Sequence, residues 1–331
     1  MDPRPLGRTG ISVPPLCLGT MIFGRQIDEA TSFAIMDKAF EAGVDFFDTA
    51  NIYGAGETEK IIGRWMKDRG LRERTLLASK CWAPMGPTPN DRGLSRFGIQ
   101  RAVEASLKRL QTDVIDLYQV HAFDPATPID ETLRALDDLV RAGKVRYIGC
   151  SNHPAWRLAE AHGVSARLGL ERFESVQPRY NLMYREIENE LLPYARASGT
   201  AVLVYNPLAG GVLSGKYAKG EAPAAGTRYA TLPEGPIADV YHRWYFQDVH
   251  LDHVRRLHAA VSERDASLIT LAIAWVIGQP GVTSAIIGAS HPDQLDATLP
   301  APDFEIDEEL AELCDALWWS LPREPVVEGY R

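Results

Sequence analysis

The sequence predicts an α/β protein that closes a (β/α)8 barrel, the TIM-barrel architecture, with an N-terminal β-hairpin and an extra C-terminal helix. Short runs rich in β-forming residues recur along the 331 residues, and a stretch with helical apolar spacing follows each of them. Parallel strands need crossover helices, so eight such units favour a closed barrel over an open doubly wound sheet.

The individual elements follow in order along the chain. The expected strands cover residues 16–19, 46–49, 75–80, 115–120, 147–151, 175–177, 201–205 and 284–288. The expected crossover helices cover residues 29–41, 57–67, 98–110, 128–142, 154–160, 185–197, 267–277 and 292–298. The turn sequence Gly7-Arg8-Thr9-Gly10 predicts the hairpin, 307–317 the extra helix, and 220–236 one long loop. No break in composition divides the chain, so we expect a single domain over residues 1–331.

Composition and charge restrict the partners and the compartment. The chain has 35 Lys and Arg against 44 Asp and Glu, and the resulting net charge of −9 argues against nucleic acid or an anionic membrane surface. The longest apolar stretch, 268–277, is too short to span a bilayer, and the N-terminus lacks the apolar core of a secretory signal. The four cysteines are widely spaced and are expected to be free thiols. We therefore expect a cytoplasmic protein.

Four ionisable residues fall at the carboxyl ends of three consecutive expected strands: Asp48, Tyr53, Lys80 and His121. Taken singly, each has an ordinary structural interpretation, as a helix cap, a packed aromatic, a surface lysine or a core histidine. Active sites of (β/α)8 barrels lie at the carboxyl ends of the strands, so the placement of all four on one rim favours a catalytic site.

The chemistry of this set follows from its charges. A tyrosine with an ordinary pKa of about 10 is a poor proton donor at neutral pH, and a nearby ammonium lowers that pKa. Asp48 beside Lys80 would hold the ammonium in place and keep it charged, and His121 can orient a carbonyl group. Such a site suits general-acid catalysis on a carbonyl oxygen that gains negative charge.

These residues lie within motifs that resemble the aldo-keto reductase superfamily, in a bacterial-type form related to the potassium-channel β-subunit branch. The motifs are FFDTANIYGAGETEKIIG, LLASK, ASLKRLQTDVIDLYQVHAFD, VRYIGCSN, VQPRYNLMYREIENELLPYA, YNPLAGGVLSGKY and AIIGASHPDQL. They occur in the order of the family and, together with LGRTGISVPPLCLGTMIFG near the N-terminus, run almost to the end of the chain. The resemblance implies the same barrel fold.

The resemblance also implies an activity: NAD(P)H-dependent reduction of an aldehyde or ketone to an alcohol, with direct hydride transfer from the nicotinamide. Carried over position by position, Tyr53 would be the proton donor and Lys80 would lower its pKa. Asp48 would anchor the lysine, and His121 would orient the carbonyl group of a small-molecule substrate.

A cofactor site is implied in the same way, for NADPH with NADH as the alternative. Ser151, Asn152 and Gln177 would bind the carboxamide, and Tyr205 would stack on the nicotinamide ring. Asp48 is a further implied cofactor position. The others are Thr20, Met21 and Gln26 at the ribose and pyrophosphate, Asn206, Leu208, Gly210, Lys216 and Arg228 over the pyrophosphate, and Gly288, Ser290 and Gln294 at the adenosine phosphate.

The last segment departs from the pattern of NADPH-dependent relatives. His291 follows Ser290 where a stronger cation is common, and Ala297-Thr298 replaces a Glu-Asn pair. The contact to a 2′-phosphate is weaker as a result, so the choice between NADPH and NADH stays open.

Substrate selection is expected from the loops at the same rim. Phe23, Trp82, residues 85–97 and the C-terminal tail are the candidate walls of the substrate pocket. Two other functions stay open: a sugar or sugar-nucleotide oxidoreductase, and a cofactor-binding regulatory subunit. A homo-oligomer is compatible with either.

Two further patterns are set aside. Residues 210–216 fit the spacing of a phosphate-binding loop, but Tyr217 follows where Ser or Thr would bind magnesium. His242, His250, His253 and His258 cluster in a segment that is typical of an amphipathic helix with a solvated face, so no metal site is expected.

Overall fold

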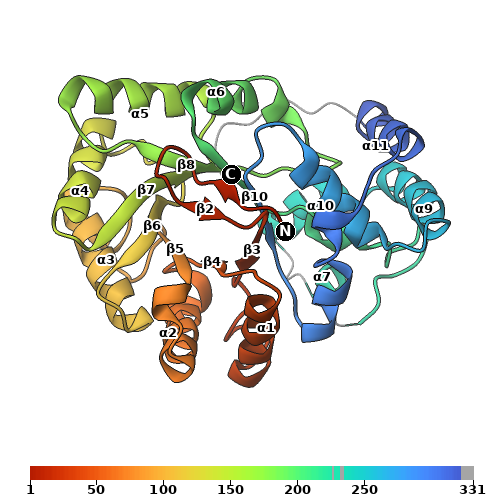
Figure 1. The fold of residues 1–331 in the computed structure, drawn as a ribbon, viewed down its shortest axis with the longest axis horizontal. Coiled ribbons are helices and arrows are strands. Elements are labelled where there is room, and N and C mark those ends of the chain that lie inside the picture. Colours follow the sequence, from red (N-terminus) through yellow and green to blue (C-terminus); the bar gives the residue numbers. More distant parts are fainter. Residues whose placement is uncertain (226, 232–234, 322–331) are drawn as a thin grey trace.

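The computed structural model describes residues 1–225, 227–231 and 235–321. Parallel strands close a barrel in the order β10-β3-β4-β5-β6-β7-β8-β9, and a short antiparallel hairpin precedes them (Figure 1). The hairpin strands are β1 (Arg4–Pro5) and β2 (Ser12–Val13). The barrel strands are β3 (Leu16–Gly19), β4 (Phe46–Asp48), β5 (Leu76–Cys81), β6 (Ile115–Val120), β7 (Val145–Ser151), β8 (Phe173–Gln177), β9 (Ala201–Val204) and β10 (Ser284–Ile287). The expected barrel and hairpin are confirmed.

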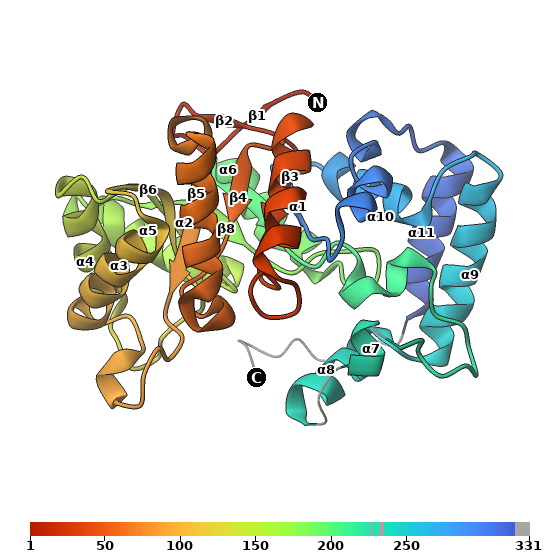
Figure 2. The same cartoon turned by 90° about the horizontal axis from the view of Figure 1, so that it is seen from below.

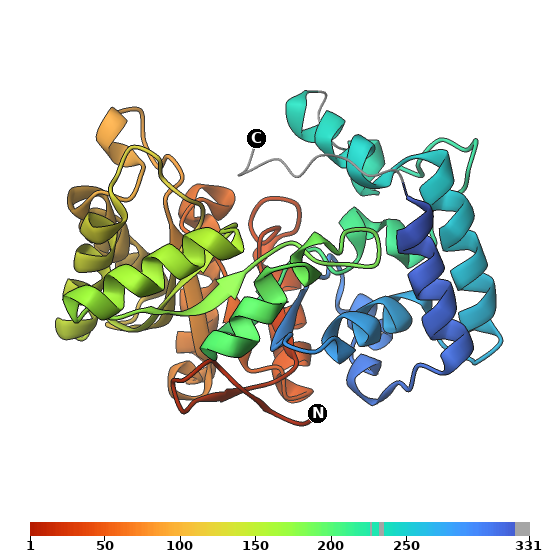
Figure 3. The ribbon, with the colours of Figure 1, turned by 90° about the horizontal axis from the view of Figure 1, so that it is seen from above.

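Helices surround the barrel, and the extra C-terminal helix packs against α9 (Figure 3). The helices are α1 (Glu29–Glu41), α2 (Glu57–Arg69), α3 (Arg96–Leu110), α4 (Ile129–Arg141), α5 (Ala155–Leu168), α6 (Leu191–Ser198), α7 (Arg228–Thr231), α8 (Pro236–Tyr245), α9 (Asp248–Ser262), α10 (Leu268–Gly278) and α11 (Glu308–Ser320). Figure 2 shows the hairpin at one end of the molecule and α7 and α8 at the other. In the described part of the chain, no helix has the length and apolar character that a bilayer crossing requires.

Three expected helices differ from the observed ones. The expected helix over 154–160 is α5, which extends to Leu168. The expected helix over 185–197 is a short 3-10 turn, Glu186–Glu188, followed by α6, which starts only at Leu191. Pro193 lies in the first turn of α6, where its missing N–H is tolerated, but it would break a helix that began at 185. The expected helix over 292–298 is a 3-10 helix, Pro292–Ala297, which ends shortly before Pro300.

Two expectations for the segment after β9 were also wrong. The expected loop contains α7, and α8 follows it, although residues 226 and 232–234 of that loop lie outside the described residues. The amphipathic α9 is confirmed, but His250 belongs to its buried face rather than to a solvated one. It lies beside Leu251 and within one turn of Val254, so the packing of α9 covers it.

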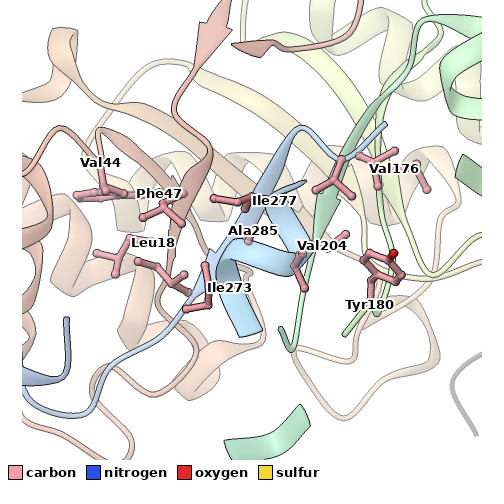
Figure 4. Packing of buried hydrophobic residues seen from close by; sticks show 14 of the residues in the cluster. Leu18, Val44, Phe47, Val176, Tyr180, Val204, Ile273, Ile277 and Ala285 are labelled. Atoms are coloured by element: carbon pink, nitrogen blue, oxygen red, sulfur yellow. The ribbon is translucent and has the colours of Figure 1, made fainter. Parts of the chain in front are cut away.

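Successive residues of each strand serve two different cores because side chains alternate across a strand. Phe46, Leu117 and Leu203 fill the inside of the barrel, where Leu6 and Val13 of the hairpin region join them. Phe47 points the other way and packs on Trp65 of α2, with ring centroids 5.2 Å apart. Figure 4 shows this outer layer, in which strand residues meet Ile273 and Ile277 of α10. With both faces packed, the strands form a rigid base for the residues at their carboxyl ends.

Helices α2 and α3 approach closely at Gly63. A Cβ at this position would lie 2.6 Å from the carbonyl carbon of Leu110 and 2.7 Å from the carbonyl oxygen of Arg109. Neither atom can move without shifting α3, so the contact requires glycine.

We therefore predict that Gly63→Ala lowers the free energy of unfolding by roughly 1–3 kcal/mol, measured by urea denaturation. The matched control is Gly163→Ala in α5, where a Cβ would meet no atom within 4 Å. Alanine there should stabilise the helix by about 0.5–1 kcal/mol. Equal effects of the two variants would contradict the close-packing argument.

A buried histidine follows β7. His153 is 4% exposed, its Nδ1 lies 2.9 Å from the carbonyl oxygen of Ser151, and the rings of Phe123 and Phe173 cover it. Burial lowers the pKa of His153 to about 4, and the hydrogen bond to Ser151 only partly opposes this effect. The imidazole is therefore neutral in the folded protein at pH 5, whereas an unfolded chain binds a proton below about pH 6.5.

The stability that His153 provides is complete above pH 6.5 and declines as the pH falls toward 4. When the pH is lowered from 7 to 5, we expect His153 to reduce the free energy of unfolding by about 1–2 kcal/mol. Denaturant titrations at both pH values should show a smaller decline for His153→Gln than for the wild type. His258→Gln, at an exposed position of α9, is the control for the substitution itself.

Candidate active site

The centre of the carboxyl-end rim is an ion pair between Lys80 and Asp48. Lys80 ends the inward face of β5 with no exposed surface, and its Nζ donates to Asp48 Oδ1 and to the carbonyl oxygen of Thr49, 2.8 Å away. Burial lowers the pKa of Lys80, but the carboxylate of Asp48, together with the interaction with Tyr53, outweighs this effect and holds the pKa above its ordinary value. The structure thus places Asp48 where it keeps Lys80 in position and charged.

The second oxygen of Asp48 is held by two glutamines. Gln177 Nε2 donates to Asp48 Oδ2 over 2.9 Å, and Gln119 Nε2 donates to the same atom over 3.1 Å. Gln177 Nε2 also lies 3.3 Å from Gln119 Oε1. Sequence reasoning missed Gln119, although its position two residues before His121 in a strand puts both side chains on one face.

Tyr53 and His121 complete the set. Tyr53 opens a 3-10 turn, Tyr53–Gly56, and its ring centroid lies 5.2 Å from Lys80 Nζ and 5.8 Å from the His121 ring, in an edge-on arrangement. Burial and the Lys80 charge lower the pKa of His121 to about 3, so its imidazole is neutral at physiological pH. Its buried Nδ1 has no hydrogen-bond partner among the described residues. The four catalytic candidates are therefore brought together.

The expected depression of the Tyr53 pKa is not found. Burial raises the pKa of Tyr53, and the charge of Lys80 and a hydrogen bond to it lower the pKa by less than burial raises it. Asp48 also raises it, since its negative charge opposes a phenolate. In this state the hydroxyl group therefore keeps its proton.

The three candidates for carboxamide binding lie side by side behind this centre. Ser151 Oγ donates to the carbonyl oxygen of Gln177 over 2.8 Å, and Asn152 Nδ2 donates to the carbonyl oxygen of His121 over 2.9 Å. The hydroxyl of Tyr205 donates to Asn152 Oδ1 over 2.9 Å, so the aromatic candidate is joined to this group.

Left-handed backbone concentrates at the same rim. Trp82 has φ of 139°, and Asn152, Asn206 and Ala209 have φ between 48° and 62°, a region that non-glycine residues rarely adopt. Such strain persists only where the surroundings fix it, and it gathers at functional sites.

The cofactor-binding candidates after β3 and β9 differ in burial and in hydrogen bonding. Thr20 is buried and donates to the carbonyl oxygen of Asp48 over 2.9 Å, whereas Met21 and Gln26 are exposed. Asn206 Oδ1 accepts from the Gly210 backbone N–H over 2.7 Å, which closes the turn between them.

The remaining residues of that segment vary in exposure. Leu208 is partly buried, Lys216 is exposed with its Nζ 5.4 Å from the Tyr217 ring centroid, and Arg228 begins α7, although its side chain lies outside the described part.

The adenosine-phosphate candidates sit on the exposed surface after β10. A Cβ at Gly288 would meet no atom within 4 Å, so the backbone there is open to a ligand. The Ser290 N–H donates to Gln294 Oε1 over 2.8 Å, and Gln294 Nε2 donates to Ser290 Oγ over 3.1 Å. These two side chains are thus brought together.

The substrate-wall candidates differ from each other. Phe23 has no exposed surface and packs in the outer core, and its place in a substrate pocket stays a prediction. Trp82 is partly exposed directly after β5 and remains on the rim. Residues 322–331 of the tail lie outside the described residues.

The structure also bears on metal binding and on the thiols. No group of three or more His, Cys, Asp or Glu within residues 1–225, 227–231 and 235–321 is arranged to hold a metal ion. All four cysteines are free and buried.

Comparison with known proteins agrees with this geometry. The family model described as "Aldo/keto reductase family" matches residues 15–318. An uncharacterized oxidoreductase of Bacillus subtilis, YrpG, is 42% identical over 322 residues, which cover 95% of this chain and 94% of that protein. A probable voltage-gated potassium channel subunit beta of Oryza sativa is 37% identical over 335 residues, which cover 100% of both. Aldo-keto reductase YhdN of Bacillus subtilis is 34% identical over 317 residues, 93% of this chain and 91% of that protein. Together with the barrel, these matches support an oxidoreductase, and the chain belongs to the aldo/keto reductase family.

Proposed function

We propose that the protein reduces an aldehyde or ketone to an alcohol with NADPH, or alternatively NADH, as the hydride source. The observation that carries the proposal is the charged Lys80, which Asp48 holds beside the protonated Tyr53. We further propose that the chain acts as a single domain in the cytoplasm, in keeping with its free, buried thiols.

Tyr53 is the proton donor in this proposal. Burial keeps its hydroxyl protonated at rest, so a proton is available when the substrate arrives. As the carbonyl oxygen gains negative charge, the proton moves from the Tyr53 oxygen to that oxygen, and the Lys80 ammonium stabilises the phenolate that forms. The raised pKa of the resting tyrosine is thus compatible with its role, because the stabilising cation is already in place.

His121 orients the substrate. A neutral imidazole keeps one ring N–H, and this N–H can donate a hydrogen bond to the carbonyl oxygen without competing with Tyr53 for the proton. The lowered pKa of His121 suits this role, because an imidazolium beside Lys80 would add a second positive charge.

The residues around the centre fit a nicotinamide cofactor. Ser151, Asn152 and Gln177 offer amide and hydroxyl groups to a carboxamide, and Gly288 leaves the backbone open at the outer end. When bound, such a cofactor supplies the hydride for the carbonyl carbon. Ser290 and Gln294 would contact the adenosine phosphate. In the described part of the chain, the buried Nδ1 of His121 and Oδ1 of Asn51, three residues after β4, lack a hydrogen-bond partner, which supports a rim completed by a ligand.

One relative favours a second candidate function. The Oryza sativa protein that matches the whole chain carries the name of a probable channel subunit, so a cofactor-binding regulatory subunit is the alternative. Slow turnover of every carbonyl compound together with tight cofactor retention would favour it.

Replacement of Tyr53 by Phe tests the proton donor. We expect Tyr53→Phe to lower kcat by about 10²–10⁴-fold, because only the general acid is lost, while the Kd for NADPH changes little. Tyr118→Phe is the matched control, since this buried hydroxyl lies outside the proposed site and lacks a hydrogen-bond partner among the described residues. Undiminished turnover by Tyr53→Phe would refute the assigned role.

Fluorescence titration of the purified protein with NADPH and NADH tests the cofactor. We expect both to bind, with NADPH tighter by about tenfold, the value of one charge-assisted hydrogen bond to its extra phosphate. Gln294→Ala should reduce this difference, because it removes the partner that orients Ser290. Equal binding would contradict the preference for NADPH, and binding of neither would contradict the oxidoreductase proposal.

A further inference from the structure

Arg179 lies at the mouth of the barrel, but it is not one of the proposed catalytic, cofactor-binding or substrate-wall residues. Gln177 points inward to Asp48, and Arg179 follows two residues later, so both side chains leave the same face of the extended chain. A parallel bridge pairs Arg179 with Tyr205, the proposed stacking residue of the nicotinamide. Arg179 therefore borders the proposed ligand site.

Aromatic rings cover both faces of its guanidinium group. The guanidinium carbon lies 3.6 Å from the ring centroid of Tyr184 and 3.5 Å from that of Trp244, with Tyr245 at 5.8 Å. Stacking of this kind fixes the plane of the guanidinium and leaves only its in-plane N–H groups for hydrogen bonding. These groups match the planar oxygens of a carboxylate or a phosphate.

No carboxylate of the residues that the structure describes neutralises this cation. Among the described residues Arg179 forms no ion pair, and its buried Nη1 has no hydrogen-bond acceptor. Two other stacked arginines differ in this respect: Arg157 lies over Phe123 and Trp156 but pairs with Glu160, and Arg185 lies over Trp275 but pairs with Glu188. A buried donor without a partner calls for an explanation, and a bound ligand is a physical one.

The surroundings of Arg179 are continuous with the proposed cofactor segment. The hydroxyl of Tyr245 accepts hydrogen bonds from the side-chain amides of Asn181 and Asn206, each over 3.2 Å. A Cβ at Gly210 would lie 3.0 Å from the ring of Tyr241, which is on the same helix as Trp244. Helix α8 thus covers the mouth between Arg179 and Gly210.

We propose that Arg179 binds an oxyanion of the ligand held in this mouth. The proposal rests on the proposed function only in placing the ligand at the carboxyl-end rim. The oxyanion has two sources: a carboxylate on the carbonyl substrate, which would make the enzyme selective for anionic aldehydes or ketones, or the diphosphate of the dinucleotide. Lys80 does not suit this purpose, because Asp48 and Thr49 take two of its three N–H donors and Tyr53 interacts with the third.

Equilibrium binding distinguishes these sources without requiring turnover. The wild type, Arg179→Met and Arg179→Lys are titrated with NADPH, with 4-(hydroxymethyl)benzoate and with its neutral counterpart, benzyl alcohol. If the substrate supplies the oxyanion, Arg179→Met should raise the Kd for 4-(hydroxymethyl)benzoate by about tenfold and leave benzyl alcohol unchanged. If the cofactor supplies it, the Kd for NADPH should rise by a similar factor instead.

Three controls separate charge from structure. Arg179→Lys keeps the charge and should recover part of the affinity, and added guanidinium ion should partly restore binding by Arg179→Met. Arg157→Met removes a stacked arginine that already has a carboxylate partner and should leave all three Kd values unchanged.

Turnover is measured separately with 4-carboxybenzaldehyde and benzaldehyde. If the wild type binds these ligands but turns over neither aldehyde, the proposed function is contradicted. The titrations with Arg179→Met still decide whether Arg179 binds the oxyanion. Unchanged Kd values for NADPH and 4-(hydroxymethyl)benzoate in a folded Arg179→Met protein would overturn the Arg179 proposal, as would failure of the wild type to bind either anion.

Discussion

The buried ion pair of Lys80 and Asp48 is the interaction on which the rest of the rim depends. An ammonium without solvent contact loses its hydration, and this loss is offset only if its donors and its counter-ion are fully hydrogen-bonded. Several strands provide these hydrogen-bonding partners. Asp48 comes from β4, and the two glutamines that donate to it, Gln119 and Gln177, come from β6 and β8. A change in the register of any one of these strands would leave a buried charge without a partner.

The barrel stabilises this ion pair because its closure leaves no sheet edge and packs both faces of every strand. Phe46 inside and Phe47 outside fix the register of β4, and Asp48 follows at the rim. Strain at Trp82, Asn152 and Asn206 is concentrated where the strands end. The well-packed layers below thus support a rim whose backbone and charges would be unstable by themselves.

Burial also sets the protonation states that the proposed chemistry requires. It raises the pKa of Tyr53 and lowers the pKa of His121, so the tyrosine holds its proton and the imidazole stays neutral. Lys80, by contrast, keeps its charge, because the carboxylate of Asp48 accepts a hydrogen bond from it directly. The same low-dielectric surroundings that make the ion pair costly therefore assign separate roles to three titratable groups.

The sequence by itself determined the alternation of strands and helices, the hairpin turn and the four ionisable residues at the strand ends. These features are local, since period, turn chemistry and strand position are read from neighbouring residues. Tertiary structure alone decided that Phe23 is buried, that Gln119 shares Asp48 with Gln177, and that Arg179 is stacked on aromatic rings with no counter-ion within the described ranges. It also reversed the expected shift of the Tyr53 pKa. Each of these depends on which distant residues surround a side chain and how completely they exclude water, and no local pattern in the chain encodes that.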